Sequence, residues 1–456
     1  MNELPIFQTA GALNIKRRSM GLKLFIVCAL ALAMSIPAFF VEDIVEDRTH
    51  RAADVVKEIG GHVGGQQTFL GPTLAIPYNI PAASDLVRHG IYLVFPSQAS
   101  ATLKTRTEER SRSLFKVPVF QADLRFDASF DLTGVPDGAP QNAVLDWSRA
   151  EFIVGVTDAR GAQSDGTLTI SGKSLTLAPA AVAQTLSLGT DPSQQLRLTL
   201  FGAKPANIQP GTQFATTSSL RFSGAQRIAV LAYGKTTHLA MQGDWPNPSF
   251  DGGFLPVNRT VSPAGFTADW TVPFIARGVR AEGASEAITG LDATSLGVSF
   301  VELADPYQSV TRSLKYILLF LGLIFLSYFV FEVTTGKRVH PAQYALVGVA
   351  QIIFYLLLLS LAERVGFDFG FLIAGAATVA LLSANAGWIF ASHIQAVRAG
   401  IVFTLLYTLI YLLLRIEDNA LLVGAIASFL AVAAAMYFTR SIDWYGSLPD
   451  PEALNE

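Results

Sequence analysis

Six long apolar segments constrain this chain more than any other feature of its sequence. The first covers residues 22–41, and five more lie between residues 316 and 438. A helix rises about 1.5 Å per residue, so about 20 apolar residues cross a hydrocarbon core about 30 Å thick. Charged residues make up only 15% of the chain, whereas soluble domains carry nearer a quarter. The sequence therefore predicts an integral membrane protein.

The charges around these segments predict which side of the membrane each end of a segment faces. Lys16, Arg17 and Arg18 precede the first segment, and acidic residues follow it. Basic residues gather on the cytoplasmic side of a membrane, so the N-terminal end of this segment is expected in the cytoplasm. The connections in the C-terminal third alternate between basic and acidic in the same sense. The predicted C-terminal spans are 316–331, 344–361, 371–391, 401–414 and 421–438.

These spans divide the chain into predicted regions. A cleaved signal peptide is the competing interpretation of the first segment, but its apolar run is too long and residues 37–40 form a poor cleavage site. We therefore expect a retained anchor, with both termini in the cytoplasm of a bacterium and the main domain in the periplasm. The expected regions are a cytoplasmic tail (1–21), a transmembrane helix (22–41), a periplasmic β-rich domain with an N-terminal amphipathic helix (42–314), a five-helix transmembrane domain (315–439) and a second cytoplasmic tail (440–456).

Most of the region between the anchor and the later spans has a residue pattern that is typical of β-strands. Apolar residues recur at helical spacing from Ile44 to Ile59, and the glycines at 60, 61, 64 and 65 are expected to end that helix. Beyond it, short runs with period-2 alternation are separated by Gly, Pro, Asn and Asp, as in antiparallel sheets. About a dozen strands are too many for one compact sheet, so we expect a sandwich-like domain or two subdomains. The fold class is α+β.

Several classes of chemistry find no support in the sequence. The net charge is −3 and no long basic run is present, which disfavours nucleic acid as a partner. The single cysteine, Cys28, rules out a disulfide within the chain. The six histidines are scattered, and neither a phosphate-binding P-loop nor a G-x-S-x-G nucleophile motif occurs. We expect no metal site and no cofactor.

Ionisable groups near the bilayer centre would indicate a transporter or pump. In this chain Glu332, Glu363 and Arg364 fall at predicted helix ends, where their side chains are expected to reach the interface.

The stretch GDWPNPSFDGGFLP, residues 243–256, invites an active-site interpretation because it carries Asp244 and Asp251. Prolines lie between the two carboxylates and prevent a regular geometry that would align them. Trp245, Phe250 and Phe254 can bury a large apolar area instead. We therefore expect a structural corner, which could also serve as a docking surface if Trp245 is exposed.

Several stretches, taken in order and including SLFKVPVFQADLRFDASFDL, resemble the inner membrane protein CreD family, also called cell envelope integrity inner membrane proteins. The resemblance extends over residues 16–363, although GGHVGGQQ lacks a tryptophan expected before the glutamine. The candidate structural or docking signature comprises Gln67, Gly71, Pro72 and Pro77 of QQTFLGPTLAIP; Trp245, Pro248, Phe250, Phe254 and Pro256 of DWPNPSFDGGFLP; and His340, Gln343 and Tyr344 of HPAQY, with Glu363.

The resemblance implies a role in envelope integrity and stress response and supplies no catalytic residues. Our leading hypothesis is a non-enzymatic protein of the bacterial inner membrane whose periplasmic β-domain binds an envelope partner. The alternative is handling or transport of a lipid or small amphiphile through an apolar groove. A further alternative is a membrane enzyme acting on envelope lipid or glycan, with Asp244, Asp251 and Glu363 as its candidates.

Overall fold

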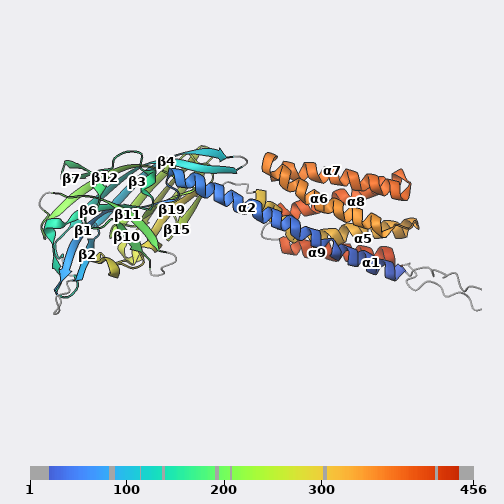
Figure 1. Ribbon diagram of the computed structural model, residues 1–456, viewed down its shortest axis with the longest axis horizontal. Coiled ribbons are helices and arrows are strands. Elements are labelled where there is room, and N and C mark those ends of the chain that lie inside the picture. Colours follow the sequence, from blue (N-terminus) through green and yellow to red (C-terminus); the bar gives the residue numbers. More distant parts are fainter. Residues whose placement is uncertain are drawn as a thin grey trace, which may run out of the picture. The chain divides into compact units, whose positions relative to one another are not determined.

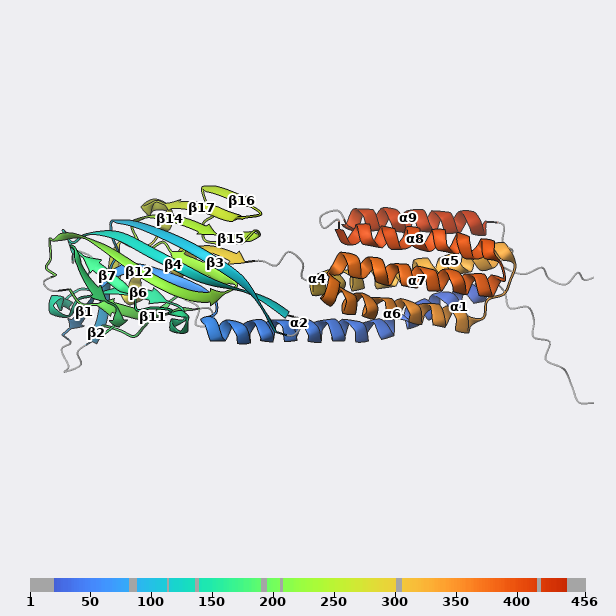
Figure 2. The ribbon, with the colours of Figure 1, turned by 90° about the horizontal axis from the view of Figure 1, so that it is seen from above.

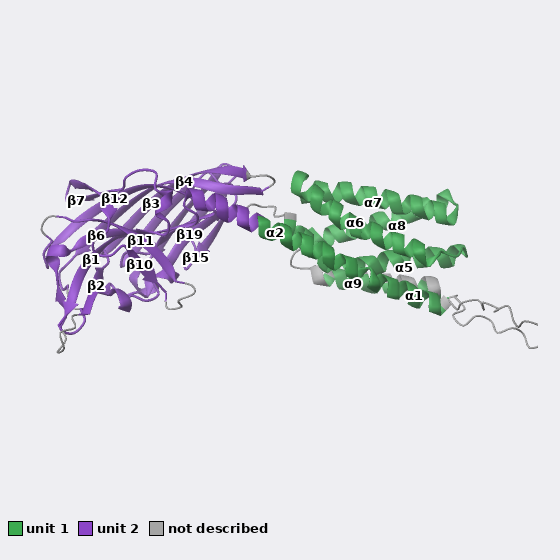
Figure 3. Ribbon diagram, viewed as in Figure 1, with its two compact units in different colours: residues 1–51, 304–456 green, residues 52–303 purple. Residues whose placement is uncertain are grey.

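The computed structural model describes residues 20–81, 88–112, 115–135, 139–189, 195–205, 208–300, 306–415 and 420–440. The chain forms two compact units, one of residues 1–51 with 304–456 and the other of residues 52–303 (Figure 3). The first is helical and the second is rich in β-structure, so the α+β class with a large β-rich domain and several apolar helices is confirmed.

The helical unit contains helices from both ends of the chain. Within the described residues, five helices are long and apolar enough to cross a membrane: the N-terminal helix over Gly21–Val63, and α5 to α8. A turn at Met34 divides the N-terminal helix, because Pro37 cannot donate to the carbonyl of Ala33. The helices are α1 (Met20–Ala33), α2 (Ser35–Val63), α4 (Pro306–Lys315), α5 (Ile317–Thr335), α6 (Pro341–Val365), α7 (Phe367–Phe390), α8 (His393–Arg415) and α9 (Ala420–Thr439).

The β unit consists of two sheets (Figures 1 and 2). The first has the order β10-β11-β6-β1-β13-β19-β15, with β2, β5, β9 and β18 attached at its margins. Its strands are β1 (Gln67–Ile80), β2 (Arg88–Val94), β5 (Val144–Leu145), β6 (Glu151–Val156), β9 (Ala178–Pro179), β10 (Thr185–Leu188), β11 (Leu196–Ala203), β13 (Arg227–Leu231), β15 (Pro248–Gly252), β18 (Glu282–Ala284) and β19 (Ser295–Phe300).

The second sheet has the order β16-β17-β14-β3-β4-β12-β7-β8. Figure 2 shows β14, β17 and β16 as successive strands at one edge of this sheet. Its strands are β3 (Gln98–Arg112), β4 (Phe115–Asp131), β7 (Thr167–Ile170), β8 (Lys173–Thr176), β12 (Gln213–Ala225), β14 (Thr236–Gly243), β16 (Asn258–Ser262) and β17 (Gly265–Val272).

Most strand pairs are antiparallel, as the sequence predicted, but the sheets are mixed. β1 pairs in parallel with β13, and β14 pairs in parallel with β3. The chain changes sheets between β12 and β13 at Gln226, whose φ of 66° lies in the left-handed region. This crossing places β13 beside β1, although alternation of apolar residues alone cannot reveal which strands are neighbours.

One apolar core fills the space between the two sheets. The ring of Phe69 in β1 lies 5.3 Å from that of Phe222 in β12, and Phe130 in β4 lies 5.0 Å from Phe152 in β6. Both pairs join one sheet to the other in edge-to-face geometry. The β unit is therefore a single sandwich with a shared core, rather than two subdomains.

Candidate functional site

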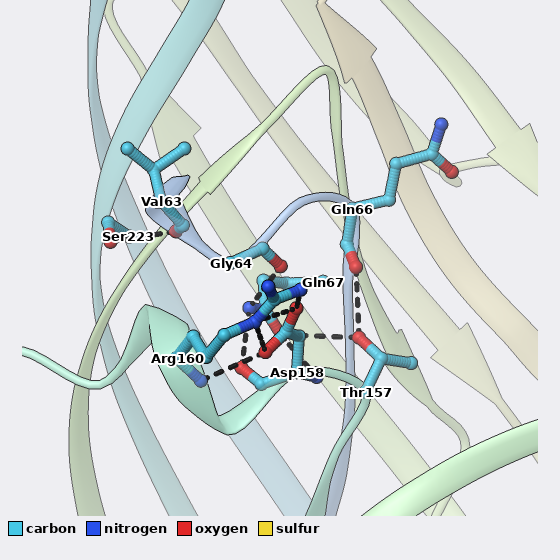
Figure 4. A network of polar contacts seen from close by, with 8 residues as sticks. All are labelled: Val63, Gly64, Gln66, Gln67, Thr157, Asp158, Arg160 and Ser223. Atoms are coloured by element: carbon cyan, nitrogen blue, oxygen red, sulfur yellow. Dashed lines mark hydrogen bonds and ion pairs between the residues drawn. The ribbon is translucent and has the colours of Figure 1, made fainter. Parts of the chain in front are cut away.

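The signature residue Gln67 is completely buried at the start of β1 and makes four hydrogen bonds (Figure 4). Its amide nitrogen donates to the carbonyl oxygens of Gly64, at 2.8 Å, and Asp158, at 2.9 Å. Its amide oxygen accepts from the Thr157 hydroxyl at 3.2 Å and the Asp158 backbone at 3.4 Å. The amide is thus satisfied on both sides by neighbouring protein groups and presents no reactive group.

This network joins the end of α2 to the β unit. Gly60 and Gly61 lie inside α2, so the expectation that they end the helix was wrong, and Gly64 and Gly65 with positive φ end it instead. The Ser223 hydroxyl of β12 donates to the last helical carbonyl, that of Val63, at 2.9 Å. Side chains of the final turns pack on the sheet, namely Val56, Ile59 and Val63 against Val117, Val119 and Ala225.

Asp158 and Arg160 lie at the base of the same network. The Arg160 guanidinium bonds the Asp158 carboxylate, with Nη2 2.6 Å from Oδ2. This bond holds the pKa of the Asp158 carboxyl below its usual range. The ion pair fixes the short 3-10 turn Ala159–Gly161, in which the Gly161 carbonyl accepts from the Ser223 hydroxyl at 3.2 Å.

A chain of polar contacts runs from β1 to the 243–256 stretch. Arg227 in β13 donates to Asp251 in β15 at 2.8 Å and reaches the Thr68 hydroxyl at 3.5 Å. The Ser299 hydroxyl of β19 also donates to Asp251, at 2.5 Å. Because β1, β13, β19 and β15 are successive strands, two signature segments that are far apart in sequence meet on one sheet.

Gly71 and Pro72 shape the middle of β1. The pairing of β1 with β6 shifts register between Leu70 and Thr73, which is a bulge where a proline without an N–H can be accommodated. A Cβ on Gly71 would lie 2.7 Å from the ring of Tyr233. The phenol of Tyr233 donates to Ser100 and Asp127 carbonyls of the second sheet. Glycine at position 71 therefore lets this tyrosine join the two sheets. Pro77, near the far end of β1, borders a cavity.

The 243–256 stretch closes one edge of the sandwich. Pro248 begins the edge strand β15, where a missing N–H costs no ladder bond. Trp245 is buried and packs edge-to-face on Phe300, so it offers no exposed docking surface. The ring of Phe250 packs on Phe266 and Trp270 of the other sheet.

The rest of this stretch is held by backbone contacts or is partly exposed. The Phe254 carbonyl accepts from the indole of Trp270 at 3.0 Å, and Pro256 is half-buried beyond it. Asp244 accepts a backbone N–H from Thr107 at 2.8 Å. The segment is part strand and part turn, built around aromatic packing.

In the helical unit, Glu332 of α5 is the centre of a buried cluster. Its carboxylate is 2% exposed and pairs with the ammonium of Lys23 in α1. It also accepts from the hydroxyl of the signature residue Tyr344 in α6 and from the backbone of Val339, both at 3.0 Å. Glu332 lies three residues before the end of α5, as expected for a helix end, and its three partners hold the charge inside the unit.

A second cluster surrounds Glu363 near the end of α6. Its side chain is 8% exposed, accepts from the hydroxyl of Tyr307 in α4 at 3.0 Å and lies 3.8 Å from the guanidinium of Arg48 in α2. At the start of α6, the His340 ring accepts from the Ala342 N–H and caps the helix. Gln343 donates its backbone N–H to the His340 carbonyl.

In this arrangement the buried carboxylates position helices and strands and are less suited to catalysis. Asp251, Glu332 and Glu363 each bond a cation and at least one hydroxyl group of this chain. Within the described ranges, no group of three or more His, Cys, Asp and Glu side chains could hold a metal ion. Among the signature residues, Gln67 takes part in the junction between α2 and the sandwich, while Tyr344 and Glu363 take part in the clusters whose ion pairs hold α1 to α5 and α2 to α6.

The sequence did not predict which cations bond these carboxylates. Lys23, Arg48 and Arg227 belong to no recognisable motif, and Lys23 is separated from Glu332 by 309 positions. The available signal was a charge inside or beside an apolar segment, since a charge buried there requires a partner.

Comparisons with known proteins agree with this architecture. A family model described as "Inner membrane protein CreD" matches residues 19–445. The inner membrane protein CreD of Escherichia coli (strain K12) is 31% identical over 442 residues, which cover 93% of this chain and 94% of that protein. A putative nutrient binding protein from Legionella pneumophila covers 56% of this chain and 80% of its own at 9% identity, but a TM-score of 0.25 supports no argument. The sequence resemblance is thus confirmed, and the chain belongs to the CreD family of inner membrane proteins.

Proposed function

We propose that this chain is a non-enzymatic inner-membrane protein whose β unit lies in the periplasm and binds a component of the cell envelope. In this role the N-terminal helix anchors the β unit, and the helices α5 to α9 form a five-helix membrane domain with both termini in the cytoplasm. The function contributes to envelope integrity under stress.

The observation that carries this proposal is how the signature residues are used. Gln67 ties α2 to the sandwich, and Tyr344 and Glu363 take part in ion-pair clusters that hold α1 and α2. The three carboxylates that an enzyme could use are engaged as well, since Asp244, Asp251 and Glu363 all accept hydrogen bonds from this chain. This arrangement supports a β unit that is anchored by the helices and binds a partner, rather than a catalytic site that cleaves a bond.

The proposal is tested by photo-crosslinking in living cells. A photoreactive residue replaces either an exposed residue of the β unit, such as His89 in β2, or an exposed residue of α7, such as Leu372. We expect an envelope component to be captured from the β unit only. Capture from neither position, or hydrolysis of peptidoglycan or ester substrates by the purified chain, would contradict the proposal.

A separate experiment tests on which side of the inner membrane the β unit lies. Cys28 is the only cysteine, so Cys28→Ser provides a background in which one new cysteine replaces Lys173. A membrane-impermeant maleimide that crosses only the outer membrane should label this cysteine in intact cells. Labelling only after the inner membrane is broken would place the β unit in the cytoplasm.

A second candidate, handling of a lipid or amphiphile, is favoured by a groove between α6 and α7. It encloses about 410 Å³, and its lining is almost entirely apolar, including Leu346, Ile353, Ala377, Leu381 and Trp388. A hydrocarbon chain fits such a lining. Native mass spectrometry of the full chain should then show a retained lipid that Ala377→Phe displaces. Equal lipid retention by the variant would remove this candidate.

A further inference from the structure

A polar cavity lies at the end of β1 that is remote from the α2 junction. It encloses about 630 Å³ and is bordered by β1, β2, the starts of β6 and of the 3-10 turn Ser285–Ala287, and the residue after β11. Tyr78 borders this cavity, while Gln67 lies eleven residues earlier in the same strand. A strand rises about 3.3 Å per residue, so the cavity is about 35 Å along β1 from the junction. It is therefore separate from the contacts that position α2.

The lining of the cavity includes a buried carboxylate that has no cationic partner among the described residues. Glu151 is 6% exposed, and its Oε2 accepts the backbone N–H groups of Ala181, at 2.8 Å, and Val182, at 3.1 Å. Within the part of the chain that the structure describes, it forms no ion pair and its Oε1 has no donor. A Cβ on Gly202 would lie 2.2 Å from this Oε1, so glycine leaves the space that the carboxylate occupies.

A second acidic group stands beside a buried phenol. Tyr78 is 7% exposed, and Glu286 borders the same cavity. Burial and the negative charge of Glu286 raise the pKa of the Tyr78 phenol. Tyr78 thus remains a neutral hydroxyl beside the carboxylate of Glu286.

Cationic groups border the same cavity. The ammonium of Lys204 is exposed and has no hydrogen-bond or ion-pair partner among the described residues. Arg149 is already bound to Asp146, with Nε 2.7 Å from Oδ2. The lining of the cavity therefore includes two carboxylates, Glu151 and Glu286, and the ammonium of Lys204, which no other described residue pairs with.

We propose that this cavity binds a zwitterionic, peptide-like ligand, whose ammonium group contacts Glu151 and Glu286 and whose carboxylate contacts Lys204. The inference rests on the proposed function, because it names the chemical class that the β unit recognises in the envelope. A neutral sugar would leave the buried Glu151 carboxylate without a counter-charge, and a dianion would be repelled by Glu151 and Glu286. Only a ligand with both charges satisfies both regions of the cavity.

The probe is trialanine with free ends, compared with its N-acetylated and C-amidated forms. Binding to the full chain in detergent is measured by isothermal titration. We expect acetylation to weaken binding about tenfold and amidation to weaken it less, since the carboxylate meets an exposed lysine. Glu151→Gln should abolish the preference for the free amine, and Lys204→Gln should abolish the preference for the free carboxylate. Lys173→Gln, an exposed substitution in β8, should change neither preference.

If Glu151→Gln folds poorly, Lys204→Gln still tests the inference, because Lys204 is exposed and has no partner among the residues that the structure describes. Equal binding of the three peptides, or no binding of any, would overturn the inference. If the crosslinking experiment still captures an envelope component in that case, the proposed function survives and only this ligand class fails. If nothing is captured and no peptide binds, both fail.

Discussion

The N-terminal helical segment is held differently in the two units. In the helical unit, α1 and the first part of α2 are held by charge, through Lys23 with Glu332 and Arg48 with Glu363. In the β unit, the last turns of α2 pack apolar side chains on the sandwich, and the neutral amide of Gln67 completes the contact.

The difference follows from the surroundings in which each contact forms. In a lipid environment, apolar packing gives little preference for one helix neighbour over another, so buried polar groups determine which helices meet. In water, burial of apolar side chains supplies that preference, and a neutral amide satisfies buried backbone groups without the desolvation cost of an ion. The comparison predicts that the two regions respond differently to substitution.

The largest effect is expected at Glu332. Glu332→Ala leaves the Lys23 ammonium without its partner and should lower the free energy of unfolding in detergent by about 3–5 kcal/mol. The double variant Lys23→Met with Glu332→Met should recover most of this loss, because it removes both charges. If Glu332→Ala lowers the free energy of unfolding no more than the double variant does, the ion pair with Lys23 does not hold α1 in place.

The effect at Gln67 is expected to be somewhat smaller. Gln67→Leu keeps the volume of the side chain but leaves the carbonyls of Gly64 and Asp158 without donors, which should cost about 2–4 kcal/mol. The matched control is Gln66→Leu at the exposed neighbouring position, with an expected change below about 0.5 kcal/mol. Urea unfolding followed by tryptophan fluorescence measures both variants, and equal losses would show that the amide network is unimportant.

Substitution of Gly71 tests whether close packing between the two sheets excludes a larger side chain at this position. Gly71→Ala places a Cβ against the Tyr233 ring and should destabilise the sandwich by about 1–3 kcal/mol. Combining it with Tyr233→Leu should make the alanine nearly neutral in a double-mutant cycle. An unchanged cost of the alanine in that background would point to backbone strain instead.

The smallest effect concerns acid stability. The folded-state pKa of Asp158 lies below its ordinary value of 3.8, so its contribution is present above that value and is lost as pH falls through the folded pKa. Stability of the β unit should therefore decline below about pH 4, and Asp158→Asn should make that decline shallower. A decline of the same steepness in the variant would assign the acid sensitivity to other carboxylates.

Local pattern was sufficient to predict much of the fold. Apolar length predicted the helices α5 to α8, and period-2 alternation predicted the strands of the sandwich, because both signals depend only on near neighbours in sequence. Phe250 and the prolines of the 243–256 stretch were expected in a structural corner, because proline and aromatic residues restrict that segment on their own, and the structure places Pro248 and Phe250 in the edge strand β15.

Features that depend on distant partners could not be predicted. The parallel pairing of β1 with β13 depends on where the chain changes sheets, and the burial of Glu332 depends on a lysine in another helix. Gly60 and Gly61 remain helical because the sandwich packs against that turn of α2, and tertiary contact then overrides the low helix propensity of glycine.

Hydrogen exchange of α1 and of the α2 junction tests most directly whether the two regions are held independently by different contacts. Exchange by mass spectrometry would be compared over residues 20–33 and 56–67 in the wild type, Glu332→Ala and Gln67→Leu. The account predicts that Glu332→Ala accelerates exchange only over 20–33, and that Gln67→Leu accelerates it only over 56–67. Acceleration of both segments by either variant would contradict it.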